Sequence, residues 1–216
     1  MRSYFVKYLE REKMENIKII GTIHGFHLKN KNYTFQHLNE FIENFSPDII
    51  GIEVREEDML ETNQYLKNHY PPEMIYVKEF FEKRLKIVGF DYRGEELKNK
   101  KIEFWNKYNQ QIINSKDKKC SQILARKRLI FTEYFTNYSL VQCQELLNKE
   151  NIIEELEEIT KEISSNKDNL YLNFSLERDN KILENIKKII NENPYKRILI
   201  LTGFTHLYDI KKRLFK

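Results

Sequence analysis

The pattern Gly-x-x-His occurs near both ends of this chain. It occupies residues 21–24, where it ends at His24, and residues 203–206, where it ends at His206. An imidazole can ligate a metal ion, exchange a proton near neutral pH or bind haem iron. Since each copy follows a mostly apolar run typical of a buried strand, both histidines are expected at one edge of a sheet.

Two acidic residues hold comparable positions between these histidines. Glu53 lies inside an apolar run, where an ionised carboxylate is costly unless it is paired or ligates a cation. Asp91 directly follows another apolar run. Imidazole and carboxylate groups together suit zinc, manganese and related ions. We therefore predict a divalent-metal site whose ligands are His24, Glu53, Asp91 and His206.

The same groups could also work without a metal. A histidine would then act as general base, Glu53 would orient it, and a second histidine or an arginine would face the oxyanion. Structural roles are a further alternative: a salt bridge from Glu53 to Arg55, Arg93 or Arg178, and a turn cap for Asp91. Spacing in the sequence does not decide between these roles.

Two more residues could contribute to such a site. Arg178 lies in the charged triplet 177–179 of a predicted helix and could clamp a carboxylate or phosphate with two parallel hydrogen bonds. His27 follows His24 by three residues in a predicted loop, and it could either join the site or be exposed. His37 and His69 are interpreted as surface residues.

Four apolar runs are predicted to form the strands that position these residues, at 17–20, 49–54, 86–90 and 197–201. Periodic apolar patterns predict helices between them, at 33–45 with Thr34 as the cap, 56–68, a stretch ending at 83, 170–191 and 207–215. This alternation predicts an α/β fold with a mostly parallel central sheet of about four strands flanked by helices. The first two strands and their helix should form a strand–helix–strand unit with a right-handed crossover.

The segment 95–167 has a different character from the rest of the chain. Its pattern is helical throughout, with no convincing strand, so we interpret it as a large helical insertion after the third strand. Its aromatic residues fit helical core packing. We therefore expect one α/β domain spanning 1–216 that contains this insertion.

Composition argues against several classes of protein. The chain has 37 basic and 33 acidic residues, so its balance gives no reason to expect nucleic-acid binding. No apolar run approaches the roughly 18 residues of a membrane span, and the first residues have no apolar signal-peptide core. Cys120 and Cys143 make neither a metal-binding nor a disulfide pattern. A cytoplasmic protein is expected.

In its motifs the chain resembles the TraB/TIKI family, which belongs with erythromycin-esterase-like and ChaN-like proteins. The resemblance rests on both Gly-x-x-His copies, PDIIGIE at 47–53, GFDYR at 89–93, ERD at 177–179 and LTGFTHL at 201–207. It implies an α/β core in which His24, Glu53, Arg178 and His206 face one cleft. Asp91 and Arg93 are matched beside them.

The family resemblance also implies a kind of chemistry. TIKI members are described as metal-dependent peptidases that favour manganese or cobalt, erythromycin-esterase relatives hydrolyse an ester, and ChaN relatives bind haem. We therefore expect a metal-dependent hydrolase acting on a peptide or small-molecule amide, with Glu53, Arg178 and His206 as catalytic residues. The alternatives are a metal-free esterase, a non-catalytic haem- or ligand-binding module, and an interaction protein whose helical insertion binds a partner.

Overall fold

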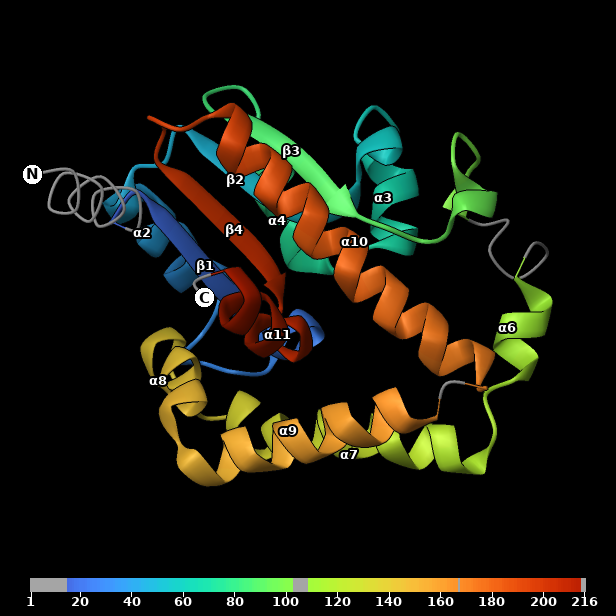
Figure 1. The fold of residues 1–216 in the computed structure, drawn as a ribbon. Helices are drawn as coiled ribbons and strands as arrows, with labels where there is room; N and C mark the ends of the chain where they lie inside the picture. Colours follow the sequence, from blue (N-terminus) through green and yellow to red (C-terminus); the bar gives the residue numbers. More distant parts are fainter. Residues whose placement is uncertain (1–14, 103–108, 167, 215–216) are drawn as a thin grey trace, which may run out of the picture.

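The computed structural model describes residues 15–102, 109–166 and 168–214, and within these it forms a parallel four-stranded sheet (Figure 1). The strands, in the spatial order β1-β4-β2-β3, are β1 (Ile17–Thr22), β4 (Ile198–Gly203), β2 (Ile49–Arg55) and β3 (Lys86–Asp91). Helices flank the sheet, and a block of helices follows β3. The predicted α/β class is thus confirmed.

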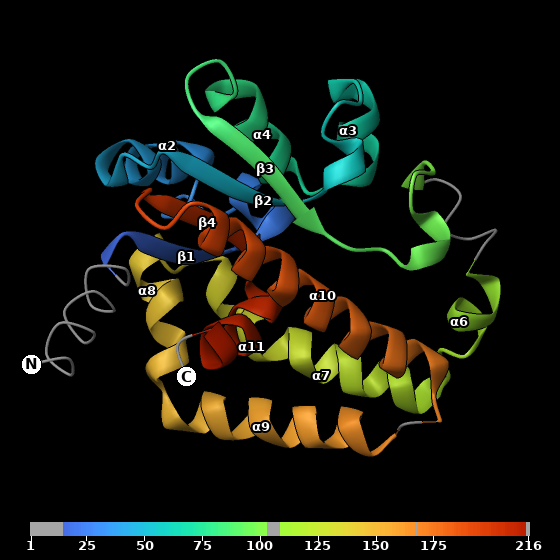
Figure 2. The same ribbon diagram turned by 45° about the horizontal axis from the view of Figure 1, so that its top comes forward.

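Helices cover both faces of the sheet (Figure 2). One face carries α2 (Phe35–Phe45) and α4 (Pro72–Phe81), with α3 (Asn63–His69) beside α4, and the other carries α10 (Leu170–Glu192) and α11 (Phe204–Leu214). A further layer is made of α6 (Gln110–Asn114), α7 (Lys118–Phe135), α8 (Leu140–Glu145) and α9 (Glu150–Ser165). Four 3-10 turns complete the described elements: η1 (His24–Leu28), η2 (Glu56–Asp58), η3 (Glu95–Leu97) and η5 (Leu146–Asn148). Of the helices in the described ranges, none has the length and apolar character that a membrane crossing needs.

Two element boundaries differ most from the sequence prediction. The helix predicted from 56 begins only at 63, after Thr62, whose side chain accepts from the backbone N–H of Tyr65 at 3.2 Å. The helix predicted from 207 begins at Phe204, directly after β4, so His206 lies in its first turn. The cap predicted at Thr34 is confirmed, since its hydroxyl accepts from the backbone of His37.

The last strand lies in the middle of the sheet. β4 pairs with β1 on one side and with β2 on the other, so the first two strands are not neighbours. All six residues of β4 are buried, as a strand covered on both faces requires. Edge strand β3 begins instead with the exposed Lys86. Two segments far apart in the sequence, β1 and β4, therefore lie side by side, with Thr22 opposite Gly203.

The two Gly-x-x-His copies pack against each other through their glycines. A Cβ at Gly21 would overlap the ring of Phe204, which belongs to the other copy. A Cβ at Gly203 would lie 2.6 Å from Nε2 of His24. Each glycine therefore leaves the space that a side chain of the other copy occupies, which explains why both positions lack a side chain.

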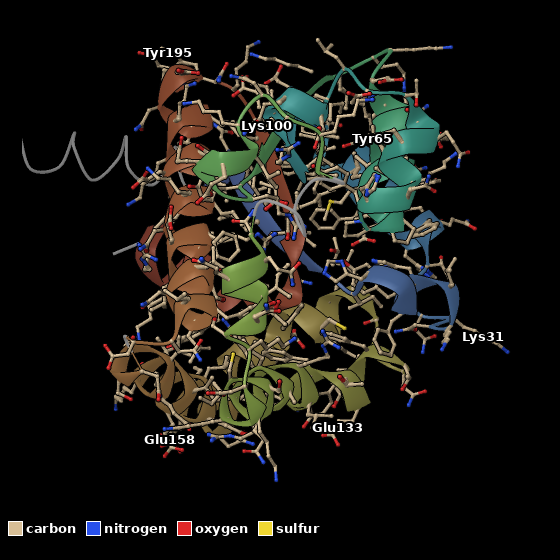
Figure 3. All side chains as sticks on the ribbon, turned by 90° about the vertical axis from the view of Figure 1, so that its right-hand side faces the viewer. Lys31, Tyr65, Lys100, Glu133, Glu158 and Tyr195 are labelled. Atoms are coloured by element: carbon tan, nitrogen blue, oxygen red, sulfur yellow. The ribbon has the colours of Figure 1, made fainter. Side chains whose placement is uncertain are left out.

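The helical insertion is anchored at the same edge of the sheet. The rings of Phe131 and Phe135 on α7 contact that of Phe204 edge-on, with centroids 4.7 and 5.3 Å apart. Such contacts fix ring positions as well as bury area. On the outer side of this layer, Glu133 and Glu158 point away from the sheet (Figure 3). The insertion thus covers the ends of β1 and β4.

Replacing Gly21 with alanine should lower the free energy of unfolding by about 1–3 kcal/mol, because the new methyl group overlaps buried side chains. The matched change Gly25→Ala should shift it by less than about 0.5 kcal/mol, since a Cβ there has no neighbour within 4 Å. Urea unfolding of both variants measures the difference. Equal midpoints would contradict the packing described here.

Candidate functional site

A largely buried guanidinium lies at the centre of the predicted site. Nη2 of Arg178 donates to Oε1 of Glu53 at 2.8 Å and to Oδ1 of Asp91 at 2.6 Å. Nε donates to the same oxygen of Asp91 at 2.9 Å, and Nη1 lies 3.0 Å from Nε2 of His206. The structure therefore brings Glu53, Asp91, Arg178 and His206 into one network.

An irregularity in β2 helps to place Glu53. The register between β2 and β3 sets Glu53 and Val54 opposite Phe90 alone, which is the arrangement of a β-bulge. Gly89 permits this bulge, because a Cβ there would overlap the carbonyl oxygen of Val54. Asp91 ends β3, directly after the bulged segment. Neither the bulge nor the need for Gly89 is visible in the sequence pattern.

Both oxygens of Glu53 are occupied. While Oε1 accepts from Arg178, Oε2 accepts from the backbone N–H of Gly203 at 2.6 Å and from the hydroxyl of Thr202 at 3.0 Å. Burial alone would raise the pKa of the Glu53 carboxyl, but the side chains of His206, Arg178 and His24 outweigh it and hold that pKa well below its ordinary value. Glu53 is therefore ionised in the folded protein.

Asp91 is held just as completely. Its side chain is 0% exposed. Oδ1 also accepts from the backbone N–H of Tyr92 at 2.8 Å, and Oδ2 accepts from Nε of Arg93 at 2.8 Å. Arg93 thus reaches the network through Asp91. Burial would lower the pKa of Arg178, but Asp91 and Glu53 raise it above its ordinary value.

The orientation of His206 follows from its two partners. Nδ1 lies 2.7 Å from Oδ1 of Asp179, and Nε2 lies 3.0 Å from Nη1 of Arg178. Because an arginine can only donate, Nε2 must accept and the ring carries its proton on Nδ1. Both ring nitrogens of His206 therefore have protein partners. Burial would raise the pKa of Asp179, but His206 outweighs it and lowers that pKa.

His24 has a different environment. Nδ1 lies 2.7 Å from Oε1 of Glu73, which also accepts from the hydroxyl of Thr22 at 2.7 Å. Nε2 lies above Gly203, and among the described residues it has no hydrogen-bond partner. The side chain of His24 is 44% exposed, whereas that of Glu73 is 0% exposed. One nitrogen of His24 is thus fixed and the other is accessible.

Glu73 was not predicted as a site residue. It lies on α4, in the apolar sequence Pro-Glu-Met-Ile of residues 72–75, and a carboxylate buried among such residues needs a partner. That signal resembles the one that singled out Glu53. Burial would lower the pKa of His24, but the hydrogen bond and charge of Glu73 outweigh it and raise that pKa above 6.5. The reciprocal effect of His24 lowers the pKa of Glu73 despite burial.

The backbone at His24 supports this geometry. Its φ of 49° lies in the left-handed region, which non-glycine residues seldom adopt and which is frequent at functional sites. The side chain lines a cavity of about 490 Å³ at the carboxyl ends of β1 and β4. Thr205, in the first turn of α11, lines the same cavity. Of the two Gly-x-x-His histidines, His24 is therefore the one that lines a cavity open to a ligand.

His27 does not join the site. It is buried, with Nδ1 donating to the carbonyl oxygen of Tyr33 at 2.8 Å and Nε2 accepting from the backbone N–H of Ile23 at 3.3 Å. Its burial lowers the pKa of the ring. Both nitrogens thus hold the turn that follows β1, which is a structural role.

Three of the four predicted metal ligands, Glu53, Asp91 and His206, are arranged around Arg178 rather than around an empty centre, and the fourth, His24, pairs with Glu73 instead. All four carboxylate oxygens of Glu53 and Asp91 already accept from protein donors. Across the ranges that the structure describes, no three His, Cys, Asp or Glu side chains are grouped to hold a metal ion. This donor set does not fit a divalent ion without displacing the guanidinium, and metal dependence stays a prediction.

Comparisons with models of known protein families, with curated proteins and with solved structures gave no match to this chain. The resemblance to the TraB/TIKI family therefore rests on the motifs themselves.

Replacing Arg178 with glutamine should cost about 3–5 kcal/mol of unfolding free energy at pH 7, because buried carboxylates lose their cation. The matched change Arg126→Gln, which breaks exposed pairs with Glu155 and Glu162, should cost less than about 1 kcal/mol. Urea unfolding measures both.

The deficit of the Arg178 variant should shrink as the pH falls. In the parent, the lowered pKa of Glu53 gives stability that is present above the pKa of the unfolded carboxyl and lost as the pH falls through the folded one. In the variant that contribution is absent, so lowering the pH reduces its free energy of unfolding by less than it reduces that of the parent. A deficit that stays constant from pH 7 to pH 4 would contradict this account.

Proposed function

We propose that this chain is a hydrolase of the TraB/TIKI type that cleaves a carboxylic ester or amide, with His24 as the general base. One observation carries this proposal: Nδ1 of His24 is held by the buried Glu73, while Nε2 is free beside a cavity. A histidine oriented by a carboxylate through one nitrogen can take a proton with the other. His206 lacks this freedom, because Arg178 and Asp179 occupy both of its nitrogens.

The hydrogen bond to Glu73 sets the state of the base. Since the lowered pKa of Glu73 keeps it ionised, it accepts the proton of Nδ1 and leaves the lone pair on Nε2. In the reaction, Nε2 takes a proton from water as the water oxygen bonds to the substrate's carbonyl carbon. The electron pair of the C=O bond moves to the carbonyl oxygen. When that pair returns, the bond to the leaving group breaks, and the leaving group receives the proton from His24.

Negative charge on the carbonyl oxygen would meet a favourable environment. The amino end of α11 adjoins the cavity at Phe204 and Thr205, and the amino end of a helix favours negative charge. Glu53 and Arg178 do not contact the substrate in this mechanism and act as positioning residues for the segment beside His24. Glu53 accepts from Gly203, above which His24 lies, and Arg178 keeps Glu53 in place.

The change His24→Gln should reduce kcat for 4-nitrophenyl butyrate and for the corresponding 4-nitroanilide by about 10²–10⁴-fold, the usual cost of losing a general base. Circular dichroism and urea unfolding would check that the fold is retained. The control is Glu79→Gln, also on α4, whose carboxylate pairs with Lys67 at 2.7 Å outside the site. If His24→Gln and Glu79→Gln were equally active, His24 would not be the base.

The pH profile should identify Glu73 as the partner of this base. The base works unprotonated, so kcat/KM in the parent should rise with pH through a pKa above the ordinary 6.5. Glu73→Gln removes the charge that raises this pKa, so the rise should move to lower pH while kcat on the plateau falls. An unchanged midpoint in Glu73→Gln would contradict the assignment.

Metal removal separates this mechanism from the metal-dependent peptidase predicted from the family. After dialysis against EDTA and elemental analysis, the metal-free mechanism predicts undiminished turnover. The metal-dependent alternative predicts that EDTA abolishes turnover and that Mn²⁺, Co²⁺ or Zn²⁺ restores it. It also predicts that these ions restore no turnover in the His206→Gln variant. A Soret band on haem titration that disappears in His24→Gln, without turnover, would favour the ligand-binding alternative.

A further inference from the structure

The cavity beside His24 has cationic side chains and no acidic side chain in its lining. Its volume is about 490 Å³. The lining residues are Thr22, Ile23, His24, Gly25, Phe26, Lys29, Arg128, Thr132, Phe135, Phe204 and Thr205. In a chain with 37 basic and 33 acidic residues, a lining without a carboxylate is a local departure from the overall balance.

Neither of the two permanent cations of this cavity is neutralised. Among the described residues, Lys29 and Arg128 have no ion-pair partner, although both are exposed. The residues that precede Arg128 on α7 behave differently: Arg126 pairs with Glu162 at 3.0 Å, and Lys127 pairs with Asp209 at 2.9 Å. Arg128, which faces the cavity, is thus the cation of this run that is left available to a ligand.

A second cavity provides a contrast within the same molecule. It lies at the end of β3 and measures about 420 Å³. Its lining includes the acids Glu56, Glu57, Asp91 and Glu95 as well as Arg55, Arg93 and Lys98. The cavity at the end of β3 thus contains carboxylates among its lining residues, whereas the described residues that line the cavity beside His24 include none.

Aromatic rings form the apolar wall of the cavity beside His24. Phe26 meets Phe135 edge-on with centroids 5.8 Å apart, and Phe135 meets Phe204 edge-on at 5.3 Å. Rings fixed in this way present a preformed apolar surface, to which alkyl and aryl groups bind without reorganising it. A ligand that fits both features has an apolar body and an anionic end.

We propose that the substrate is an apolar ester or amide that carries a separate free carboxylate, which Lys29 and Arg128 bind while the apolar body lies against the phenylalanine rings. This inference rests on the proposed hydrolase function for its reaction, but the anion site does not depend on turnover. A guanidinium binds a carboxylate with two parallel hydrogen bonds, and a nearby lysine adds charge.

Calorimetric titration of the full chain with 4-phenylbutyrate and with its neutral amide tests the anion site directly. The parent should bind the carboxylate roughly tenfold more tightly than the amide, as expected for a charge-assisted hydrogen bond. The preference should weaken as salt is added. Lys29→Gln and Arg128→Gln should each reduce the preference for the carboxylate over the amide. The control Arg126→Gln, on the same helix as Arg128, should leave this preference unchanged. Equal affinities for the two ligands, or equal effects of Arg128→Gln and Arg126→Gln, would overturn the anion site.

Turnover of a matched pair of esters tests the substrate class. The half-ester 4-nitrophenyl glutarate should have a lower KM than 4-nitrophenyl butyrate. Arg128→Gln should raise the KM for the glutarate and leave the KM for the butyrate unchanged. Binding of 4-phenylbutyrate with no hydrolysis would support the anion site and overturn the hydrolase. Hydrolysis of both esters with equal KM values would leave the hydrolase standing and overturn the substrate class.

Discussion

The guanidinium of Arg178, buried between two carboxylates, is the interaction on which the site depends. Glu53 on β2 and Asp91 on β3 are both removed from water, which would be prohibitive for two like charges without a cation between them. Arg178 supplies that cation from α10, and the same guanidinium contacts His206 on α11. Two strands and two helices are therefore locked together by one side chain at the carboxyl edge of the sheet.

The central position of β4 makes this edge a meeting point of distant segments. β4 lies between β1 and β2, so the two Gly-x-x-His copies begin at the carboxyl ends of adjacent strands. Gly203 then leaves room for His24, and Gly21 leaves room for Phe204. Phe204 in turn packs against α7, and this contact places the helical insertion over the cavity that His24 lines.

The site contains two imidazole–carboxylate pairs whose environments divide their roles. His206 pairs with Asp179, and its second nitrogen is taken by Arg178, so this histidine belongs to the scaffold. His24 pairs with Glu73, and its second nitrogen, which has no hydrogen-bond partner in the part of the chain that the structure describes, lies at a cavity. Similar side chains thus differ in what they can do, because only His24 faces open space: His206 holds neighbouring side chains, and His24 is the one to which we assign the proposed acid–base role.

The sequence by itself determined the strands, the α/β class and the candidate residues, because apolar periodicity and punctuation by glycine are local properties. A buried glutamate at 53 also implied a cation, with Arg55, Arg93 and Arg178 as the choices. Only the tertiary structure selected Arg178, since Arg55 pairs with Asp58 and Arg93 contacts Asp91. The bulge at Glu53, the place of β4 and the partnership of His24 with Glu73 likewise depended on through-space packing between segments far apart in the chain, which no local pattern encodes.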